Sequence, residues 1–452
     1  MLRDYQQEAV DHLVKQHRVI LGDEQGLGKT LVSLTAAIKL CGDKPRILVL
    51  APRVAVGTWV HELKKWFGME ALVYSGSSKP HEREQLWEKY QEEKPPLLVA
   101  TYGMMHELQQ RRRDWQCIIA DEYHKVGLMN HKTPTFKRFC RFSSRYLFLL
   151  TGTPVKKGPQ NLYGPLHLVS PHRFSTYWGF VNKYCMVIKD VFGHSIGPRP
   201  KDPIQFKEML APHLIRRTKK KVLKELPPLQ RQAIYLDMND DQRRYYNQLV
   251  DHGMIWTKDG TKIACPNEAT KLMRLRQLLV SPRLLGLPEL GGTIPDLLSL
   301  IEDQFDSNEP VVICTPFREA VDLITLSLKS KTSKVYRIYG QMKAPASEVA
   351  RAFQNEPTPQ KALVFTISSG MSFDAYAASN VYFVGAEWSS SDNKQAESRI
   401  HRLGQEATSV NAYYLLYPGT VDDAIIKRLD ENTMAQNWVL ETDYMLSLIK
   451  PV

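Results

Sequence analysis

A glycine-rich loop occupies residues 22–30, which read Gly-Asp-Glu-Gln-Gly-Leu-Gly-Lys-Thr and lie between an apolar run and a helical pattern. Glycines let backbone N–H groups approach phosphate oxygens, and the N-terminus of a following helix attracts anions. In a loop of this kind, shaped by Gly26 and Gly28, Lys29 reaches the β- and γ-phosphates and the Thr30 hydroxyl binds Mg²⁺. The sequence therefore predicts a phosphate-binding site here.

Two adjacent carboxylates follow an apolar run in residues 117–124, which read Cys-Ile-Ile-Ala-Asp-Glu-Tyr-His. A strand that ends in Asp121 and Glu122 places both side chains at the carboxyl edge of a parallel sheet, where open α/β sheets bind ligands. Together with the phosphate loop, this pair predicts hydrolysis of a phosphate-bearing ligand. Asp121 would hold Mg²⁺, directly or through water, and Glu122 would orient and activate the attacking water.

The elements that position these residues can be predicted from the hydrophobic pattern. Short apolar runs typical of buried parallel strands alternate with helical patterns, at residues 18–22, 46–51, 97–101, 117–121 and 146–152, and again at residues 310–315, 334–340, 361–366 and 380–385. From about residue 155 to about residue 290 the strand signals fade, and helical, basic and aromatic stretches replace them. This alternation favours an α/β chain of two lobes with helical insertions.

The dipeptide Pro227-Pro228 reads as a break between the two lobes. We predict a first lobe over residues 1–226, with a helical insertion from about residue 155. The second lobe is predicted over residues 227–452, with a helical insertion to about residue 290 and a C-terminal helix. One predicted helix of the first lobe carries an apolar stripe interpreted as core packing: Trp59, Leu63, Trp66 and Phe67.

The composition excludes several classes of protein. Hydrophobic residues make up 43% of the 452 residues and charged residues 24%, a normal globular balance. No apolar run approaches the roughly 20 residues that cross a bilayer, and the N-terminus lacks a signal-peptide layout. The six cysteines include no CxxC pair, which argues against a zinc ribbon and fits a reducing compartment. The net charge of +12 favours a polyanionic partner such as nucleic acid.

These motifs, in their order, resemble those of helicase superfamily 2 and, within it, the SWI/SNF-like DNA translocases, from residue 2 to about residue 430. Residues 2–6 resemble the family's adenine-recognition segment, which implies that Gln6 reads the base. The strict phosphate-loop pattern has glycine where this chain has Asp23, but the family's own loop carries an acid at that position.

Two further segments of the first lobe resemble motifs that couple hydrolysis to movement. Residues 121–124 are similar to the family's DExH box, in which His124 is implied to contact the nucleotide site and to link it to the second lobe. Residues 151–154, Thr-Gly-Thr-Pro, resemble the motif that couples hydrolysis to lobe movement.

The second lobe carries a segment, residues 395–405, that resembles the family's arginine-finger motif. Arg399 and Arg402 stand three residues apart, a spacing expected to place them on one helix face. Guanidinium groups suit the charge that develops in phosphoryl transfer, and the resemblance implies that both arginines touch the γ-phosphate, with Gln395 also at the nucleotide. Residues 366–380 depart from the family, since only Gly370 of a glycine-rich motif remains clearly.

Resemblance to DNA-tracking motifs is found at residues 50–66 and at Thr101-Tyr102. Residues 213–219 with 226–228, and residues 275–278, resemble segments that separate SWI/SNF-like motors from RNA helicases and imply double-stranded DNA. The DNA contacts implied by the resemblance are those of Arg53, Thr101, Tyr102, Arg216, Arg217 and Lys219.

These observations predict two RecA-like lobes that form a DNA-dependent ATPase and DNA helicase. The cofactors are ATP and Mg²⁺, and the partner is duplex and branched DNA, such as forks and four-way junctions, in replication, recombination or repair. The compact chain shows no chromatin-reading appendage, which disfavours chromatin remodelling. It favours a monomeric protein of the bacterial cytoplasm or of a phage-infected host, with no membrane partner. The alternatives are the motor subunit of a restriction-type machine and a non-catalytic DNA-binding scaffold.

Overall fold

The chain divides into two compact units, which we call lobe 1 and lobe 2. The computed structural model describes residues 2–43, 45–76, 79–112, 114–190, 193–257, 260, 262–287, 291–340, 342, 344–369 and 373–440. Lobe 1 comprises Met1–Leu223 with Glu431–Val452, and lobe 2 comprises Lys224–Asp430. The predicted division after residue 226 lies close to this one. The C-terminal helix α17 (Val421–Leu440), predicted in the second lobe, is divided between the two units.

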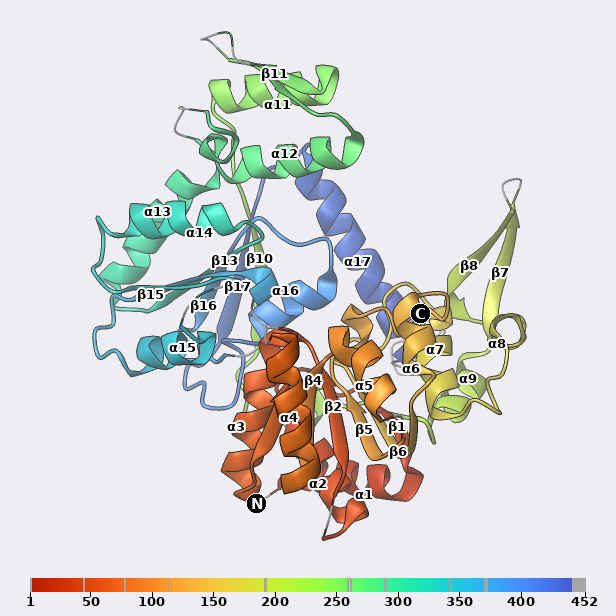
Figure 1. Cartoon of the computed structure of the whole chain (residues 1–452). Helices are drawn as coiled ribbons and strands as arrows, with labels where there is room; N and C mark the ends of the chain where they lie inside the picture. The colour runs from red at the N-terminus through yellow and green to blue at the C-terminus, as the bar shows by residue number, and fades with distance from the viewer. Residues whose placement is uncertain are drawn as a thin grey trace. The chain divides into compact units, whose positions relative to one another are not determined.

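Lobe 1 is built on a parallel sheet of seven strands in the order β3-β4-β2-β5-β6-β1-β9 (Figure 1). Its strands are short and apolar, as expected for a sheet covered on both faces. They are β1 (Arg18–Leu21), β2 (Ile47–Ala51), β3 (Ala71–Tyr74), β4 (Leu97–Thr101), β5 (Asp114–Ala120), β6 (Ser143–Leu150) and β9 (Leu214–Ile215). Alternate residues of each strand face opposite cores, because side chains alternate along a strand. In β2, for example, Leu48 and Leu50 belong to one core, and Val49 belongs to the other.

Helices cover both faces of this sheet. One face is covered by α1 (Asp4–Gln16), α2 (Lys29–Cys41) and α3 (Val56–Phe67). The other face is covered by α4 (Pro80–Glu93), α5 (Met105–Arg111), α6 (Pro134–Phe139), α7 (Tyr163–Val169), α8 (Tyr177–Tyr184) and α9 (Pro203–Leu210). The predicted apolar stripe on α3 is only partly core. Trp59 and Leu63 are each 1% exposed, whereas Trp66 is 43% exposed and donates its indole N–H to Glu62.

The insertion of lobe 1, predicted as helical, also contains a β-hairpin. Strands β7 (Cys185–Asp190) and β8 (Gly193–Pro200) pair antiparallel after α8, and Figure 1 shows them as a separate arm. The prediction did not include this hairpin, whose strands belong to neither parallel sheet, and Met186 and Ile188 of β7 are exposed. Among the described residues, no helix combines the length and the apolar character needed to span a bilayer.

Lobe 2 contains a second parallel sheet, of six strands in the order β10-β17-β16-β13-β15-β14. The strands are β10 (Leu229–Tyr235), β13 (Val311–Thr315), β14 (Val335–Ile338), β15 (Ala362–Thr366), β16 (Asn380–Val384) and β17 (Val410–Leu416). Helices flank it on both faces: α13 (Thr293–Asp306) and α14 (Arg318–Leu328) on one, α15 (Ala346–Asn355) and α16 (Ser390–Glu397) on the other. The predicted α/β class, with one parallel sheet in each lobe, is confirmed.

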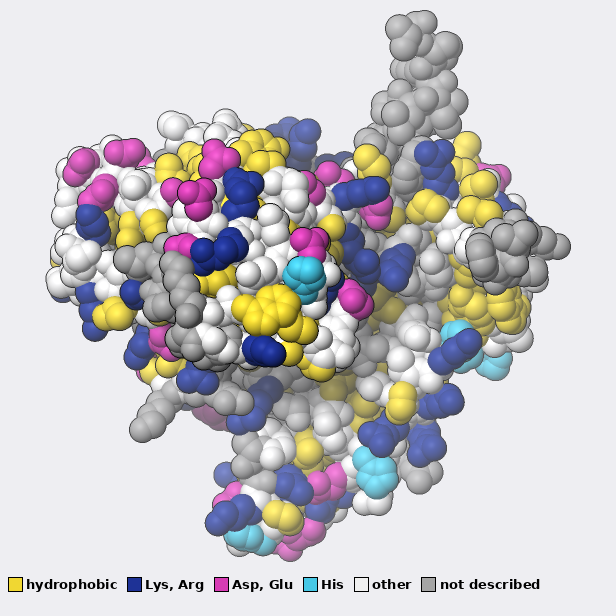
Figure 2. Space-filling model, turned by 90° about the horizontal axis from the view of Figure 1, so that it is seen from above, with side chains coloured by type: hydrophobic (Ala, Val, Ile, Leu, Met, Phe, Trp, Pro, Cys, Tyr) yellow, Lys and Arg dark blue, Asp and Glu magenta, His cyan; other side chains and the backbone are white. Residues whose placement is uncertain are grey.

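A helical insertion precedes the central strands of lobe 2, as predicted. It holds α11 (Asp240–His252), the hairpin of β11 (Met254–Trp256) and β12 (Lys262–Ala264), and α12 (Glu268–Val280). Its outer surface exposes the apolar side chains of Val250, Trp256, Leu272 and Met273. Figure 2, which views the molecule from above, shows hydrophobic side chains interspersed with basic and acidic ones on this face.

Candidate active site

The glycine-rich loop lies between β1 and α2, at the carboxyl edge of the lobe 1 sheet. Gly26 and Gly28 have φ values of 85° and 79°, the left-handed region that glycine adopts without strain. Gly28 ends the loop, and α2 begins at Lys29. A Cβ atom at Gly28 would lie 2.4 Å from the side-chain nitrogen of Gln6. A side chain at this point would therefore have to displace the end of Gln6.

Gln6 lies against the loop, and its role in base recognition stays a prediction. Its side-chain nitrogen donates to the carbonyl oxygen of Leu27 at 3.3 Å, and its side-chain oxygen accepts from the Arg3 backbone N–H at 3.1 Å. The Lys29 ammonium turns into the loop and donates to the carbonyl oxygens of Asp23 at 2.9 Å and Glu24 at 3.4 Å. Thr30, half-buried, follows in the first turn of α2.

Residues that were predicted to contact DNA fasten the loop from the side of β9. The Arg217 guanidinium forms an ion pair with Asp23, with Nε 3.1 Å from Oδ1 and a second, closer contact from Nη2 to Oδ2. Arg216 donates to the Gly22 carbonyl at 2.8 Å, and the Lys219 backbone N–H donates to Glu24 at 2.7 Å.

Arg217 is 8% exposed and Lys219 3% exposed, so neither is a surface cation in this structure. Their observed role is to hold the phosphate loop against β9, which the sequence did not predict, and their DNA contacts stay predictions. Asp23 fits this role, because it is fully buried and provides the carboxylate that Arg217 needs.

The two predicted catalytic carboxylates lie where β5 ends. Asp121 accepts a hydrogen bond at Oδ2 from the indole N–H of Trp59 at 2.9 Å. Burial and the neighbouring charge of Glu122 raise the pKa of Asp121 to about 7, against opposing effects of Trp59 and Lys29. A carboxyl group that is difficult to ionise alone is stabilised in its ionised form by a bound cation. This pattern fits the predicted magnesium ligand.

Glu122 has a left-handed backbone, with φ 46° and ψ 42°, which is uncommon for a residue with a side chain. Such strain persists where the surrounding structure imposes it, often at functional sites. Burial acts to raise the pKa of Glu122, but the contact with His124 and the charges of Lys29 and Lys125 outweigh burial and lower it. Glu122 is therefore ionised, as a group that activates water must be.

His124 connects the carboxylates to the Thr-Gly-Thr-Pro segment. Its Nδ1 lies 2.8 Å from the Thr151 hydroxyl and 3.2 Å from Glu122 Oε2, and the residue is 4% exposed. Burial lowers the pKa of His124, which favours the neutral ring. Both contacts lie within lobe 1, so the implied link from His124 to the second lobe stays a prediction.

The remaining predicted DNA contacts of lobe 1 differ in exposure. Arg53 begins a short helix, η1 (Arg53–Ala55), and is exposed. Thr101 is half-buried at the end of β4. Tyr102 is 9% exposed and its hydroxyl donates to the backbone carbonyl of Asp121 at 2.7 Å. Arg53 is thus open to solvent, whereas Tyr102 is engaged inside the lobe, and the DNA contacts of all three residues stay predictions.

The predicted arginine finger of lobe 2 has a different local structure from the one expected. Helix α16 ends at Glu397, so Arg399 and Arg402 lie in the turns that follow it, and the prediction of a shared helix face was wrong. Arg399 is 5% exposed and donates to the carbonyls of Phe373 and Gln395, and Arg402 forms an ion pair with Asp374. Gln395 is 2% exposed. Residue Gly370, singled out by the sequence, lies outside the described residues.

The chemistry of lobe 1 fits a bound nucleoside triphosphate with magnesium. The loop supplies the phosphate cradle, Thr30 and Asp121 supply oxygen ligands, and Lys29 acts electrostatically on both carboxyl groups. In the described part of the chain, no group of three or more His, Cys, Asp or Glu side chains is arranged for a metal. Magnesium commonly takes one or two protein oxygens together with phosphate oxygens and water, so this site would hold it with the nucleotide.

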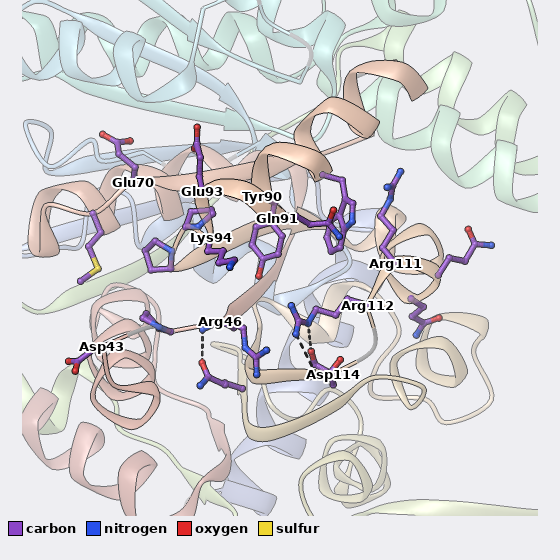
Figure 3. A pocket seen from close by; sticks show the side chains of 18 residues that line it. Asp43, Arg46, Glu70, Tyr90, Gln91, Glu93, Lys94, Arg111, Arg112 and Asp114 are labelled. Carbon is purple, nitrogen blue, oxygen red and sulfur yellow. Dashed lines mark hydrogen bonds and ion pairs between the residues drawn. The ribbon is translucent and has the colours of Figure 1, made fainter.

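A cavity of lobe 1, about 1540 Å³, lies at the opposite edge of the sheet. It is lined by residues at the amino ends of β2, β3, β4 and β5, among them Arg46, Lys94 and Asp114, together with Tyr90 of α4 (Figure 3). Its lining includes none of the predicted catalytic residues. We therefore place the active site at the carboxyl edge, where the glycine loop and the carboxylates converge.

Comparison with protein-family models matches residues 5–284 to the SNF2-related domain and residues 292–404 to the helicase conserved C-terminal domain. The first match alone covers more than half of the chain. This chain belongs to the SNF2-related family. The predicted membership of the SWI/SNF-like group is confirmed. The predicted enzyme class, a DNA-dependent ATPase and helicase, is confirmed at the level of the family.

Similar SNF2-related proteins include the CHD3-type chromatin-remodeling factor CHR7 of Arabidopsis thaliana, 27% identical over 98% of this chain. Another is the Chromodomain-helicase-DNA-binding protein 1-like of Mus musculus, 26% identical over 97% of this chain. The chain spans 38% and 50% of the lengths of these two proteins. Among solved structures, the Sulfolobus solfataricus SWI2/SNF2 ATPase core in complex with dsDNA aligns over 100% of this chain and 97% of its own, with 21% identity and a TM-score of 0.45.

Proposed function

We propose that this SNF2-related chain is an ATP-dependent translocase that moves on duplex DNA and remodels or unwinds branched DNA, such as forks and four-way junctions, in replication, recombination or repair. The observation that carries the ATPase part is the convergence of Lys29, Asp121 and Glu122 at one sheet edge. The DNA part is supported by membership of the SNF2-related family and by the net charge of +12.

The chemistry follows from the side chains of lobe 1. With magnesium bound, the metal neutralises charge on the phosphates. Thr30 and Asp121 would hold it, Lys29 would place the terminal phosphates, and Glu122, kept ionised, would orient the attacking water. Arg399 and Arg402 would stabilise the transferred phosphoryl group from lobe 2. Each would first have to leave its present partners, the carbonyls of Phe373 and Gln395 for Arg399 and the carboxylate of Asp374 for Arg402.

The deciding experiment compares ATP hydrolysis with single-stranded, linear duplex, forked and four-way-junction DNA, matched for nucleotide content. Stronger stimulation by forked or junction DNA than by linear duplex is expected for a branched-DNA remodeller. Equal stimulation by plain duplex would instead indicate a general translocase. Hydrolysis that ignores DNA of every structure would contradict the proposal.

Variants of the site test the assigned roles. Lys29→Ala and Glu122→Gln are each expected to abolish turnover and to leave DNA binding largely intact, since both residues act on the nucleotide. Lys39→Ala is a matched control, because Lys39 is exposed in the last turn of the same helix, α2. Turnover of either site variant at the control's rate would overturn the assignment. Nucleotide binding by the wild type without any phosphate release would favour the non-catalytic scaffold.

A further inference from the structure

Asp121 is held by hydrogen bonds from the two segments expected to track DNA. Its backbone N–H donates to the Leu50 carbonyl at 2.8 Å. The Trp59 indole N–H donates to its carboxylate at 2.9 Å, and the Tyr102 hydroxyl donates to its backbone carbonyl at 2.7 Å. Leu50 and Trp59 belong to residues 50–66, and Tyr102 to the second segment. Both segments therefore touch the same residue of the active site.

Trp59 is placed to determine the orientation of this carboxylate. The residue is 1% exposed on α3, and a buried indole N–H usually has an acceptor. The acceptor here is an ionisable group, and hydrogen bonds to charged groups are among the strongest in proteins. The bond is made at Oδ2, so it fixes the direction in which the carboxylate points. Residues that hold a ligand carboxylate in this way commonly govern metal affinity.

Tyr102 fixes the backbone beneath the same side chain. Its hydroxyl bonds to the carbonyl of Asp121, directly before the left-handed Glu122. Loss of this bond would relax the turn that carries both carboxylates. The exposed Arg53 starts η1, which continues without a break into α3, so a displacement at Arg53 reaches Trp59 through one continuous helical segment.

We propose that Trp59 and Tyr102 are positioning residues for the metal-binding carboxylate of Asp121, and that through them its orientation responds to DNA held by the two segments. The second part of this inference rests on the proposed function, and the first part does not. Neither residue touches the reacting atoms. Their effect is exerted through Asp121 alone.

The first part is tested by metal binding without turnover. Mn²⁺ binding, in the presence of a non-hydrolysable ATP analogue, is measured by electron paramagnetic resonance in Trp59→Phe and Tyr102→Phe. We expect Trp59→Phe to lower Mn²⁺ affinity roughly 10- to 100-fold. Tyr102→Phe is expected to have a smaller effect in the same direction, because its bond reaches the backbone and not the ligand oxygen.

Each variant has a matched control in lobe 1. Trp115→Phe removes a similarly buried indole, at the far end of β5, whose N–H has no hydrogen-bond partner among the described residues. Tyr163→Phe removes a buried hydroxyl that bonds to the Ser175 carbonyl. Mn²⁺ affinities of Trp59→Phe and Tyr102→Phe equal to those of their controls would overturn the inference. If Tyr102→Phe weakened DNA affinity and left Mn²⁺ affinity unchanged, Tyr102 would be a DNA contact and its positioning role would fail.

If Trp59→Phe fails to fold, a second replacement still tests the hydrogen bond from Trp59 to Asp121. Site-specific replacement of Trp59 by β-(3-benzothienyl)alanine exchanges the N–H for sulfur and keeps the shape, so it isolates the hydrogen bond. This variant is expected to show the same loss of Mn²⁺ affinity as Trp59→Phe. Wild-type affinity would overturn the role of the bond.

The second part is tested by the ratio of turnover with saturating duplex DNA to turnover without DNA. This ratio is expected to fall several-fold in Trp59→Phe and Tyr102→Phe and to stay at the wild-type value in the two controls. If DNA failed to stimulate the wild type, the proposed function would fail while the Mn²⁺ measurement still decided the positioning role. If DNA stimulated all variants as strongly as the wild type, the second part of the inference would be refuted and the first part would stand.

Discussion

The buried ion pair between Asp23 and Arg217 provides a sharp test of how the phosphate loop is held. Arg217→Met removes the guanidinium and keeps a side chain of similar length. The side chain of Asp23 is 0% exposed, and this change removes its ion pair with the guanidinium. The hydrogen bond from the backbone N–H of residue 217, at 2.9 Å, would be its remaining contact with that residue. The perturbation therefore leaves an uncompensated charge in the interior of lobe 1.

The magnitude follows from burial. Removing one partner of a buried ion pair typically costs about 3–5 kcal/mol. For a domain of this size, each kcal/mol shifts the midpoint of thermal unfolding by roughly 2–4 °C. A decrease of roughly 10 °C in the unfolding temperature of lobe 1 is therefore expected. ATP affinity should fall with it, because Asp23 and Glu24 form the floor of the loop that Lys29 contacts.

The assay is thermal unfolding of the full chain, with two comparison variants. Lys64→Met removes an ion pair with Glu70 of similar N–O distance, 2.8 Å, but both its side chains are more than two-thirds exposed, so it should leave the midpoint unchanged. The double variant Asp23→Gly with Arg217→Met removes both charges and should recover most of the loss. The reasoning would be refuted if Arg217→Met unfolded at the same temperature as Lys64→Met. It would also be refuted if the double variant unfolded at as low a temperature as Arg217→Met.

Three further predictions concern other parts of the chain. Gly28→Ala should weaken ATP binding at least about tenfold, because the new Cβ adds left-handed strain of about 1–2 kcal/mol and would meet Gln6 at 2.4 Å. Equilibrium titration with a fluorescent ATP analogue measures this affinity. The control is Gly57→Ala, because a Cβ at Gly57 meets nothing within 4 Å. Asp422→Asn should raise stability at pH 8 by on the order of 2 kcal/mol and leave it unchanged near pH 4. The reason is that burial raises the pKa of Asp422 to about 6, so the native state favours the protonated acid and loses stability as pH rises from about 4 through 6. Denaturant unfolding at both pH values measures the free energy of unfolding. The same difference between variant and wild type at the two pH values would contradict the prediction. Leu63→Ala should lower the free energy of unfolding by about 2–5 kcal/mol. This loss should exceed that of Trp66→Ala, because Leu63 is 1% exposed and Trp66 43% exposed. If chemical unfolding gave the reverse order, the outer face of α3 would have to be covered.

The parts of the fold that could be predicted are those that produce a recognisable pattern of neighbouring residues in the sequence. Buried parallel strands appear as continuous apolar runs, so most central strands of both sheets were found, and the glycine loop and the carboxylates were placed at the correct strand ends. Strand β10 was missed because it is an edge strand whose residues are mostly exposed, and therefore lacks an apolar run. The end of α16 at Glu397 was also missed, since the polar residues that follow would continue a helical pattern equally well.

The contacts that hold the site together could not be predicted, because they join residues far apart in the chain. Trp59 was correctly assigned to the core by its spacing, yet its bond to Asp121 spans 62 residues and no periodicity reports the direction of an indole N–H. Arg217 was predicted to contact DNA because residues 213–219 resemble a segment of SWI/SNF-like motors. Its pairing with Asp23, 194 residues away, was not predicted, and its DNA contact stays a prediction. One signal was available: an acid that replaces the first loop glycine in the interior of an α/β lobe must have a cation beside it. A search for that cation among residues predicted to lie next to β1 would have pointed to the strand that carries Arg216 and Arg217.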